Sequence, residues 1–145
     1  AGFSILKDNL KKFEDFVLKD FASKKILLNY SNIFDTELSA SSINRDFFND
    51  INKLGPFGNQ NSIPTFLIKK LKIINPKILN NKHISAILKP KIGTTIKSIC
   101  FNCVDKIIAQ YLLSYKKDVT IIGQIHENIW NNKKSIQLNI KDIVI

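Results

Sequence analysis

DKIIAQYLLSY, residues 105–115, decides the fold class by its place in the chain. The stretch predicts a helix, because Ile108, Tyr111 and Leu112 lie on one helical side and Asp105 stands where an N-cap would. On both sides of this helix apolar residues recur with the period of two that is typical of strands. We expect three strands before the helix and two after it, over residues 65–74, 83–89, 94–102, 119–128 and 135–144.

This order of elements predicts the OB-fold. Five strands with a helix between the third and fourth form a small Greek-key barrel, whose second and third strands and flanking loops bind oligonucleotides. In the first strand the apolar residues change parity between Ile68 and Leu71, so we expect a β-bulge near Lys69 and Lys70. The predicted class is therefore mainly β with α: an OB-fold barrel preceded by a helical connecting segment.

The first predicted helix lies near the N-terminus. Apolar residues from Leu10 to Phe21 are separated by steps of three and four, which predicts a helix over about residues 8–24, with Asp8 as its cap. Residues 25–34 follow with a β-like pattern. We expect this part of the chain to begin in the middle of a domain.

The stretch PFGNQNSIP, residues 56–64, connects a second predicted helix to the barrel. Apolar residues between 43 and 54 have helical spacing, with serines before them as candidate N-caps. Glycine and proline then end this helix, and a proline precedes the first strand at a position that needs no ladder donor. We predict a rigid joint formed by Gly55, Pro56, Phe57, Gly58, Asn61 and Pro64.

The charge of the chain favours polyanionic partners or anionic surfaces. Its 22 Lys and Arg residues exceed its 12 Asp and Glu residues, which gives a formal net charge of +10, and Arg45 is the only arginine. An ammonium suits phosphate better than a base edge, so nucleic-acid binding should be weakly sequence-specific. The richness in Lys, Asn and Ile could equally reflect an A+T-rich genome. No apolar run approaches the roughly 18 residues that would span a membrane, so no membrane partner is expected.

The candidate nucleic-acid interface consists of basic residues on the first three strands and around the last turn. For any single lysine the alternative is a solvated surface charge, and only clustering on one barrel face would decide between the two. Trp130 could stack on a base or cap the core, and Phe101 is expected in the core. Lys77 and Lys91 add charge beside the predicted binding residues, which are Lys69, Lys70, Lys72, Lys82, His83, Lys89, Lys97, Trp130, Lys133 and Lys134.

A metal or catalytic site is not expected in this chain. Cys100 and Cys103 form the only C-x-x-C, and neither a second pair nor a nearby pair of histidines completes a zinc set. We therefore expect both thiols to be small core residues at the end of a strand. The lack of a disulfide framework points to the cytoplasm. His83 and His126 are far apart in the sequence and have no carboxylate cluster around them.

Several stretches together resemble the C-terminal part of the RecJ family of single-strand-specific DNA exonucleases. AGFSI resembles the end of the family's DHH-associated domain, and NLKKFEDFV resembles the helix after it. DTEL resembles a connecting signature, and PFGNQNSIPTF resembles the Pro-Phe-Gly loop of the family, with Gln60 and Ser62 as departures. The stretches NKHISAIL, SICFN and ENIWNNKKSIQLNIKDI look like its barrel strands.

The resemblance implies three segments and a role in binding. Residues 1–25 would end the DHH-associated domain, residues 26–58 would connect, and residues 59–145 would form the OB-fold domain. The chain would bind single-stranded DNA and guide it to a catalytic core elsewhere in the polypeptide, in DNA repair and recombination. The alternative is a scaffold or protein-interaction domain with little DNA affinity.

The resemblance also implies what this chain lacks. The family's metal site is built from Asp and His motifs, and no D-H-H triplet occurs here, so the fragment should not be an enzyme by itself. No cofactor is expected in the fragment, whereas the parent 5′–3′ exonuclease would use Mn²⁺ or Mg²⁺. Expected partners are single-stranded DNA, the catalytic domains of the same polypeptide and, as a further candidate, a single-strand-binding protein.

Overall fold

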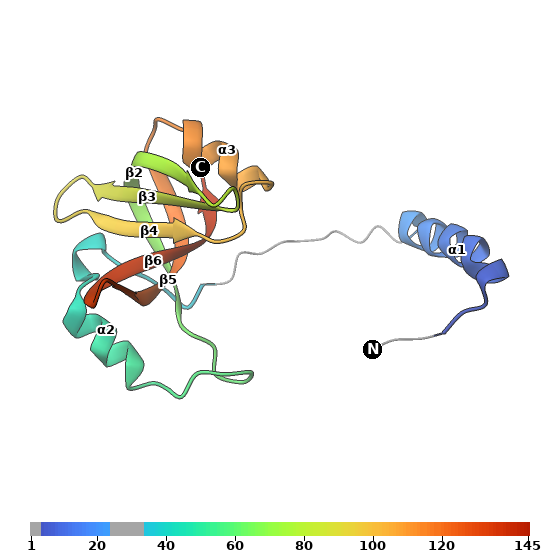
Figure 1. Ribbon diagram of the computed structural model, residues 1–145, viewed down its shortest axis with the longest axis horizontal. Coiled ribbons are helices and arrows are strands. Elements are labelled where there is room, and N and C mark those ends of the chain that lie inside the picture. The colour runs from blue at the N-terminus through green and yellow to red at the C-terminus, as the bar shows by residue number, and fades with distance from the viewer. Residues whose placement is uncertain (1–3, 24–33) are drawn as a thin grey trace. The chain divides into compact units, whose positions relative to one another are not determined.

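The computed structural model describes residues 4–23 and 34–145, which belong to two compact units, Ala1–Ser31 and Asn32–Ile145 (Figure 1). The first unit contains a short 3₁₀ helix, η1 (Lys7–Asn9), and the helix α1 (Leu10–Ser23). The first predicted helix is therefore present, but Asp8 lies inside η1 and does not cap α1. The β-like pattern predicted over residues 25–34 falls almost wholly outside the described residues.

The second unit is a closed barrel with the predicted order of elements. Its strands pair in the order β1-β2-β3-β4-β6-β5, and a further pairing of β2 with β5 closes the ring. The helix α3 joins β4 to β5, as the sequence predicts. The bounds are β1 (Thr36–Glu37), η2 (Ala40–Ser42), α2 (Arg45–Asn52), β2 (Thr65–Leu79), β3 (His83–Pro90), β4 (Ile96–Cys100), α3 (Ile107–Ser114), β5 (Val119–Trp130) and β6 (Lys133–Val144).

The OB-fold prediction is confirmed, with one strand more than expected. The additional strand, β1, has two residues and lies parallel to the start of β2. Two residues are too few to show a period, so the sequence pattern gave no sign of it. The predicted strand over residues 94–102 is shorter than expected, because the chain turns at Phe101 and Asn102 directly after Cys100.

Two irregularities let β2 bend between its neighbours. The pairing of β2 with β5 shifts between Ile68 and Leu71, and Lys70 between them has a φ of 56°. This is the predicted β-bulge. A second shift, against β3, lies between Ile74 and Lys77, and the sequence did not predict it. Bulges strengthen the local bend, which allows one strand to pair with β5 at its start and with β3 at its end.

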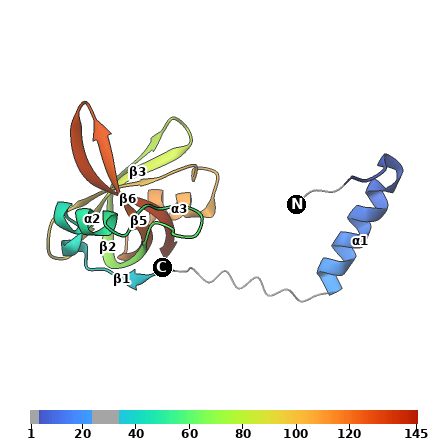
Figure 2. The same cartoon turned by 90° about the horizontal axis from the view of Figure 1, so that it is seen from below.

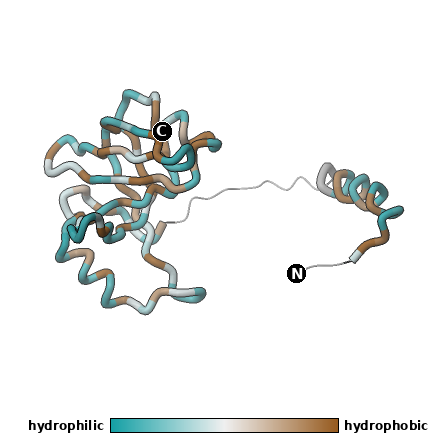
Figure 3. The backbone as a smooth tube through the Cα atoms, viewed as in Figure 1, coloured by the Kyte–Doolittle hydropathy of each residue, from teal (hydrophilic) through white to brown (hydrophobic). Residues whose placement is uncertain are grey.

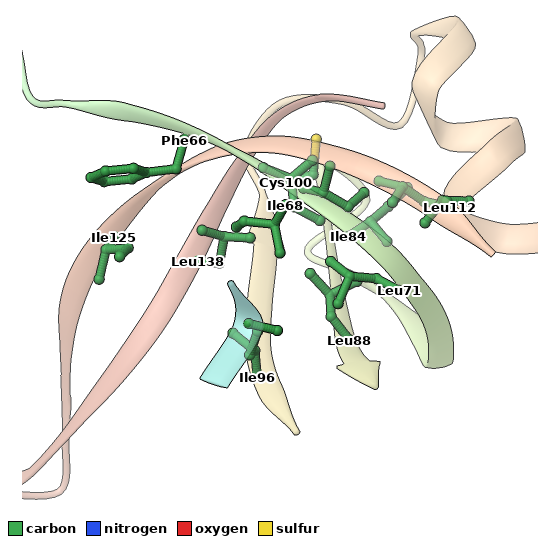
Figure 4. Close-up of a cluster of buried hydrophobic side chains, with 14 of the residues drawn as sticks. Phe66, Ile68, Leu71, Ile84, Leu88, Ile96, Cys100, Leu112, Ile125 and Leu138 are labelled. Carbon is green, nitrogen blue, oxygen red and sulfur yellow. The ribbon is translucent and has the colours of Figure 1, made fainter. Parts of the chain in front are cut away.

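The barrel encloses a core of aliphatic side chains (Figure 4). Hydrophobic and hydrophilic residues alternate along much of the sheet, so one face of each strand points inward (Figure 3). Leu112 of α3 is buried against the core. The centroid of the Phe47 ring of α2 lies 5.7 Å from the centroid of the Phe66 ring. Cys100 and Cys103 are buried free thiols, as predicted, and burial raises the pKa of Cys100.

The helices α2 and α3 both have N-cap residues other than those predicted. Asn44 is the N-cap of α2, and its side-chain oxygen accepts a hydrogen bond of 2.9 Å from the backbone nitrogen of Phe47. The serines expected in that role belong instead to η2 and its flanks, one turn earlier. Lys106, not Asp105, is the N-cap of α3, and no side chain caps this helix. Capping residues thus lay within a few positions of the predicted ones.

The predicted joint is held by one asparagine. The side-chain nitrogen of Asn61 donates to the carbonyl oxygens of Leu54 at 2.9 Å and Pro56 at 3.1 Å. Gly58 and Asn61 also exchange two backbone hydrogen bonds, of 2.8 and 3.2 Å. A Cβ at Gly58 would meet nothing within 4 Å, and its φ is not positive, so this position does not require glycine. Pro64 directly precedes β2, and Phe57 packs against the core.

Candidate nucleic-acid interface

A row of paired residues crosses the outer face of the barrel. In the register of the sheet, Ile74 of β2 lies opposite Ile87 of β3, and Ile87 lies opposite Lys97 of β4. Lys97 lies beside Gln137 of β6, which in turn lies opposite His126 of β5. Directly opposite residues share a face of the sheet. The row therefore presents an apolar floor at one end and polar or charged groups at the other.

The lysines gather in two adjoining hollows along this row. One hollow of about 460 Å³ is lined by four lysines, Lys70, Lys72, Lys89 and Lys91, together with Ile74 and Asp118. The other, of about 300 Å³, is lined by Lys77, Lys97, Ser85, Ile87 and Gln137. Ile74, in the lining of the first hollow, lies directly opposite Ile87, in the lining of the second. We call the two hollows together the lysine groove.

The lysine groove is lined by some of the predicted binding residues and by residues that the sequence analysis did not predict to bind. Of the predicted binding residues it is lined by Lys70, Lys72, Lys89 and Lys97, and Lys77 and Lys91 join them. Gln137 and Ile87 line it as well, although neither residue was predicted to bind. Their alternation with Leu138 and Leu88 was the signal that could have placed them on the outer face.

Lys69 has a different environment from its neighbour Lys70. The Nζ atom of Lys69 lies 2.6 Å from the Oε2 atom of Glu37 in β1. Both lysines line a further hollow of about 510 Å³ beside β1, but only Lys70 also lines the lysine groove. Because the charge of Lys69 is already paired, we expect it to attract phosphate less than Lys70 does.

Two hairpins project from one side of the barrel (Figure 2). The hairpin of β2 and β3 turns at Asn80 and Asn81, which both have positive φ, and carries the exposed Lys82 at its tip. His83 follows, and its Nδ1 atom accepts a hydrogen bond of 2.9 Å from the backbone nitrogen of Asn102. This bond uses one ring nitrogen of His83 in holding the adjacent turn.

Phe101 is half exposed and not a core residue, which corrects the prediction from its parity. The buried residues of β4 are Ile96, Ser98 and Cys100, so Phe101 has the parity of the strand's outward-facing residues. Its ring lies edge-on to the His83 ring, with 5.2 Å between the two centroids. The pair forms an exposed aromatic surface beside the tip of the β2–β3 hairpin.

The hairpin of β5 and β6 carries the other aromatic candidate. Trp130 is the last residue of β5 and is 73% exposed, so it does not cap the core. Lys133 and Lys134 begin β6, and the turn itself consists of Asn131 and Asn132. The lysines were predicted in the turn and are instead paired strand residues.

An ion-pair cluster joins this hairpin to α2. The Glu127 carboxylate accepts a hydrogen bond from Arg45 of α2, and its other oxygen lies 3.3 Å from the Nζ atom of Lys134. The bond from Arg45, followed by that from Lys134, lowers the pKa of Glu127, although partial burial opposes the shift. Arg45 also lies over the Phe48 ring, 5.8 Å from its centroid. The sequence did not indicate this cluster, because its members are far apart along the chain.

The Nε2 atom of the half-buried His126 is the one buried side-chain nitrogen or oxygen without a hydrogen-bond partner within residues 4–23 and 34–145. Burial lowers the pKa of this imidazole, and the nearby Lys141 lowers it further. Among the same residues, no three His, Cys, Asp or Glu side chains are grouped as a metal site. No helix in this part of the chain is long and apolar enough to cross a membrane.

Comparison with known proteins confirms the resemblance predicted from the sequence. A family model described as the RecJ OB domain matches residues 34–142. The crystal structure of RecJ in complex with Mn²⁺ from Thermus thermophilus has a TM-score of 0.68 and 18% identity, over 99% of this chain and 20% of that chain. The structure of RecJ from the same organism with Mg²⁺ has a TM-score of 0.66 and 18% identity, over 98% of this chain and 21% of that chain.

The two solved structures share the fold of this chain and are much longer. At 18% identity the likeness to the two solved structures concerns the fold. The chain spans about one fifth of the length of those structures, with 20% and 21% covered. A search of curated proteins found no significant match.

Proposed function

This chain belongs to the RecJ OB domain family, and we propose that it binds single-stranded DNA and guides it toward a catalytic core carried elsewhere in the same polypeptide. The longer protein would be a 5′–3′ exonuclease specific for single strands, acting in DNA repair and recombination. The observation that carries the proposal is the lysine groove on the outer face of β2, β3 and β4. A basic groove that follows the backbone, with surfaces on which bases can rest, is how OB-folds bind single strands.

The groove offers both kinds of contact that a single strand needs. Its lysines can neutralise phosphates, and the facing side chains of Ile74 and Ile87 offer an apolar floor between them. Phe101 and Trp130, outside the groove, are exposed aromatic rings on which a base could stack. Neither kind of contact reads a base edge, so we expect weak sequence preference.

The pairing of Lys72 with Lys89 supports a functional reason for this charge. These two lysines lie directly opposite each other on neighbouring strands. Like charges in that position destabilise a sheet, by up to about 1 kcal/mol. A polyanion bound across the pair would relieve the repulsion. The arrangement is therefore unfavourable for the fold alone and favourable for binding phosphate.

The proposal also covers the longer protein: the metal of its catalytic core, its protein partners and its location in the cell. We assign no catalytic residue and no cofactor to this chain, whose sequence has no D-H-H triplet. We propose that the core of the longer protein uses Mn²⁺ or Mg²⁺, the ions named for the Thermus thermophilus RecJ structures. Its catalytic domains and a single-strand-binding protein are the proposed protein partners, and the cytoplasm is the proposed location.

A scaffold or interaction role is the second candidate. One specific observation favours it: a hollow of about 430 Å³ between α2 and the first strands is lined mainly by apolar groups, including Phe47, Leu54 and Phe66. Asp35 and Asp50 lie at the same hollow, which has no lysine in its lining. A protein segment could rest there without any contribution to DNA affinity.

The test compares two double variants of equal charge. Lys72→Glu with Lys97→Glu changes the lysine groove, and Lys11→Glu with Lys12→Glu changes exposed lysines of α1. Fluorescence anisotropy measures binding to an oligo-dT of about 15 nucleotides over a range of salt concentrations. We expect the groove variant alone to lose affinity, with the salt slope smaller by about 1.4, or about 0.7 for each lost phosphate contact.

Three results distinguish the candidates. Loss of binding in the groove variant alone, with an unchanged circular dichroism spectrum, supports DNA binding by the lysine groove. Equal affinities for both variants and the parent chain would contradict it. If the folded parent chain binds no oligonucleotide at low salt, the scaffold role is favoured.

A further inference from the structure

The end of the β5–β6 hairpin extends beyond the rest of the sheet. Strand β4 pairs with β6 only at residues 137–139, and β2 pairs with β5 no further than Gln124. Within residues 34–145 the hairpin beyond these points consists of two strands alone, and it stands away from the barrel (Figure 2). From His126 to Trp130 it projects by about 13 Å, at roughly 3.3 Å per residue. We call residues 129–134 the hairpin tip.

Each face of the hairpin tip carries one apolar side chain and one lysine. Trp130 lies opposite Lys133, and Ile129 lies opposite Lys134. Because opposite residues share a face and successive residues alternate, the two pairs lie on opposite faces. Trp130 is 73% exposed and Ile129 is 59% exposed. An apolar surface beside an ammonium matches the base and the phosphate of a nucleotide, and here the combination occurs twice. The Lys134 ammonium is shared with Glu127 at 3.3 Å, so we expect it to attract phosphate less than Lys133 does.

The two faces lead to different parts of the barrel. The Trp130 face continues along alternate residues of β5 to His126, which lies opposite Gln137 in the lysine groove. The Ile129 face continues to Glu127, which is bound to Arg45 of α2. A strand lying in the groove would therefore meet Trp130. A strand on the other face would pass toward α2.

The hairpin tip is held in a defined conformation. Its two turn residues, Asn131 and Asn132, have φ values of 47° and 59°, as a tight two-residue hairpin turn requires. The ion pair of Glu127 with Arg45 connects the hairpin to α2, and the ion pair of Glu127 with Lys134 joins its two strands. A rigid projection loses little conformational entropy when it contacts a ligand on both sides.

We propose that the hairpin tip recognises the junction between single-stranded and double-stranded DNA and stands between the two strands where they part. The strand in the lysine groove contacts Trp130 and Lys133, and its complement contacts Ile129 and Lys134. This inference rests on the proposed binding of single-stranded DNA. A surface that only stacked one strand would need one such face, whereas a fork has a strand for each.

The experiment compares forked, single-stranded and blunt double-stranded DNA with matched labels. Ile129→Ser is the decisive variant, because Ile129 lies on the face away from the lysine groove. Ile107→Ser is its control, since Ile107 is also an exposed isoleucine, 72% accessible, but lies in α3. Anisotropy gives the affinities, and the fluorescence of the only tryptophan, Trp130, reports contact on the groove face.

We expect the parent chain to bind the fork at least about threefold more tightly than the single strand, because apolar surface of Ile129 is buried only by the fork. Ile129→Ser should bring this ratio to about one without changing single-strand affinity. Ile107→Ser should keep the parent ratio. Trp130→Ala should weaken the binding of both DNAs by about fivefold or more, because stacking serves both.

The possible failures separate the inference from its premise. Equal affinity of the parent chain for fork and single strand, or equal ratios for Ile129→Ser and Ile107→Ser, would overturn the role of the hairpin tip and leave single-strand binding in place. If the folded parent chain binds neither DNA at low salt, both the inference and the proposed function fail.

Discussion

Lys89→Glu is predicted to stabilise the fold and to weaken DNA binding. Lys89 lies directly opposite Lys72, and both side chains are exposed on the outer face of β2 and β3. The substitution replaces a like-charge pair with an unlike pair. Because such cross-strand pairs contribute about 0.2 to 1 kcal/mol, we expect the free energy of unfolding to rise by about 0.5 to 1 kcal/mol at low salt. Salt should reduce this gain, since both groups face water.

The expected loss of affinity follows from counterion release. One lysine contact to a single-stranded phosphate changes the salt slope by about 0.7, so at about 0.1 M salt it contributes about fivefold to the binding constant. Lys89→Glu should lose at least this factor. Urea unfolding followed by circular dichroism gives the stability, and anisotropy with labelled oligo-dT gives the affinity.

Lys97→Glu is the matched control. Lys97 also lines the lysine groove, but its neighbours across the sheet are Ile87 and Gln137, which are uncharged. It should lose a similar affinity without the gain in stability. The reasoning is refuted if Lys89→Glu lowers the free energy of unfolding, or if it binds oligo-dT as tightly as the parent chain at low salt.

Three further predictions concern stability and are measured by urea unfolding. Gly123→Ala should destabilise the barrel by about 2 kcal/mol or more, because the added Cβ would lie 2.8 Å from the carbonyl oxygen of Asn139. Its control, Gly58→Ala, should leave the stability unchanged, because a Cβ there would meet nothing within 4 Å. Asn61→Ala should cost about 1 to 2 kcal/mol through its two lost hydrogen bonds, and an unchanged midpoint would contradict that. The folded-state pKa of His126 is lowered, so the chain should lose stability as pH falls below about 6.5, where the imidazole of the unfolded chain gains a proton. His126→Gln should lose less stability over the same pH range, because its side chain does not titrate.

The sequence by itself determined the order of elements and therefore the fold. A helix at residues 105–115 with period-two segments on both sides indicated the OB-fold, and the change of parity between Ile68 and Leu71 located the bulge. These features are local, because the side-chain period and the parity of a strand depend only on neighbouring residues. The net charge of +10 likewise favoured an anionic partner before any strand was placed.

Only the tertiary structure decided which charges act together. Lys69 and Lys70 are adjacent in sequence, yet one pairs with Glu37 and the other lines the lysine groove. Phe101 was expected in the core, but the register of β4 turns Ile96, Ser98 and Cys100 inward and leaves Phe101 with the outward parity. Sheet register and strand ends are set by contacts between distant segments, and the environment of a side chain follows from both. For the same reason, the pairing of Trp130 with Lys133, which sequence alone does not give, determines which residues share each face of the hairpin tip.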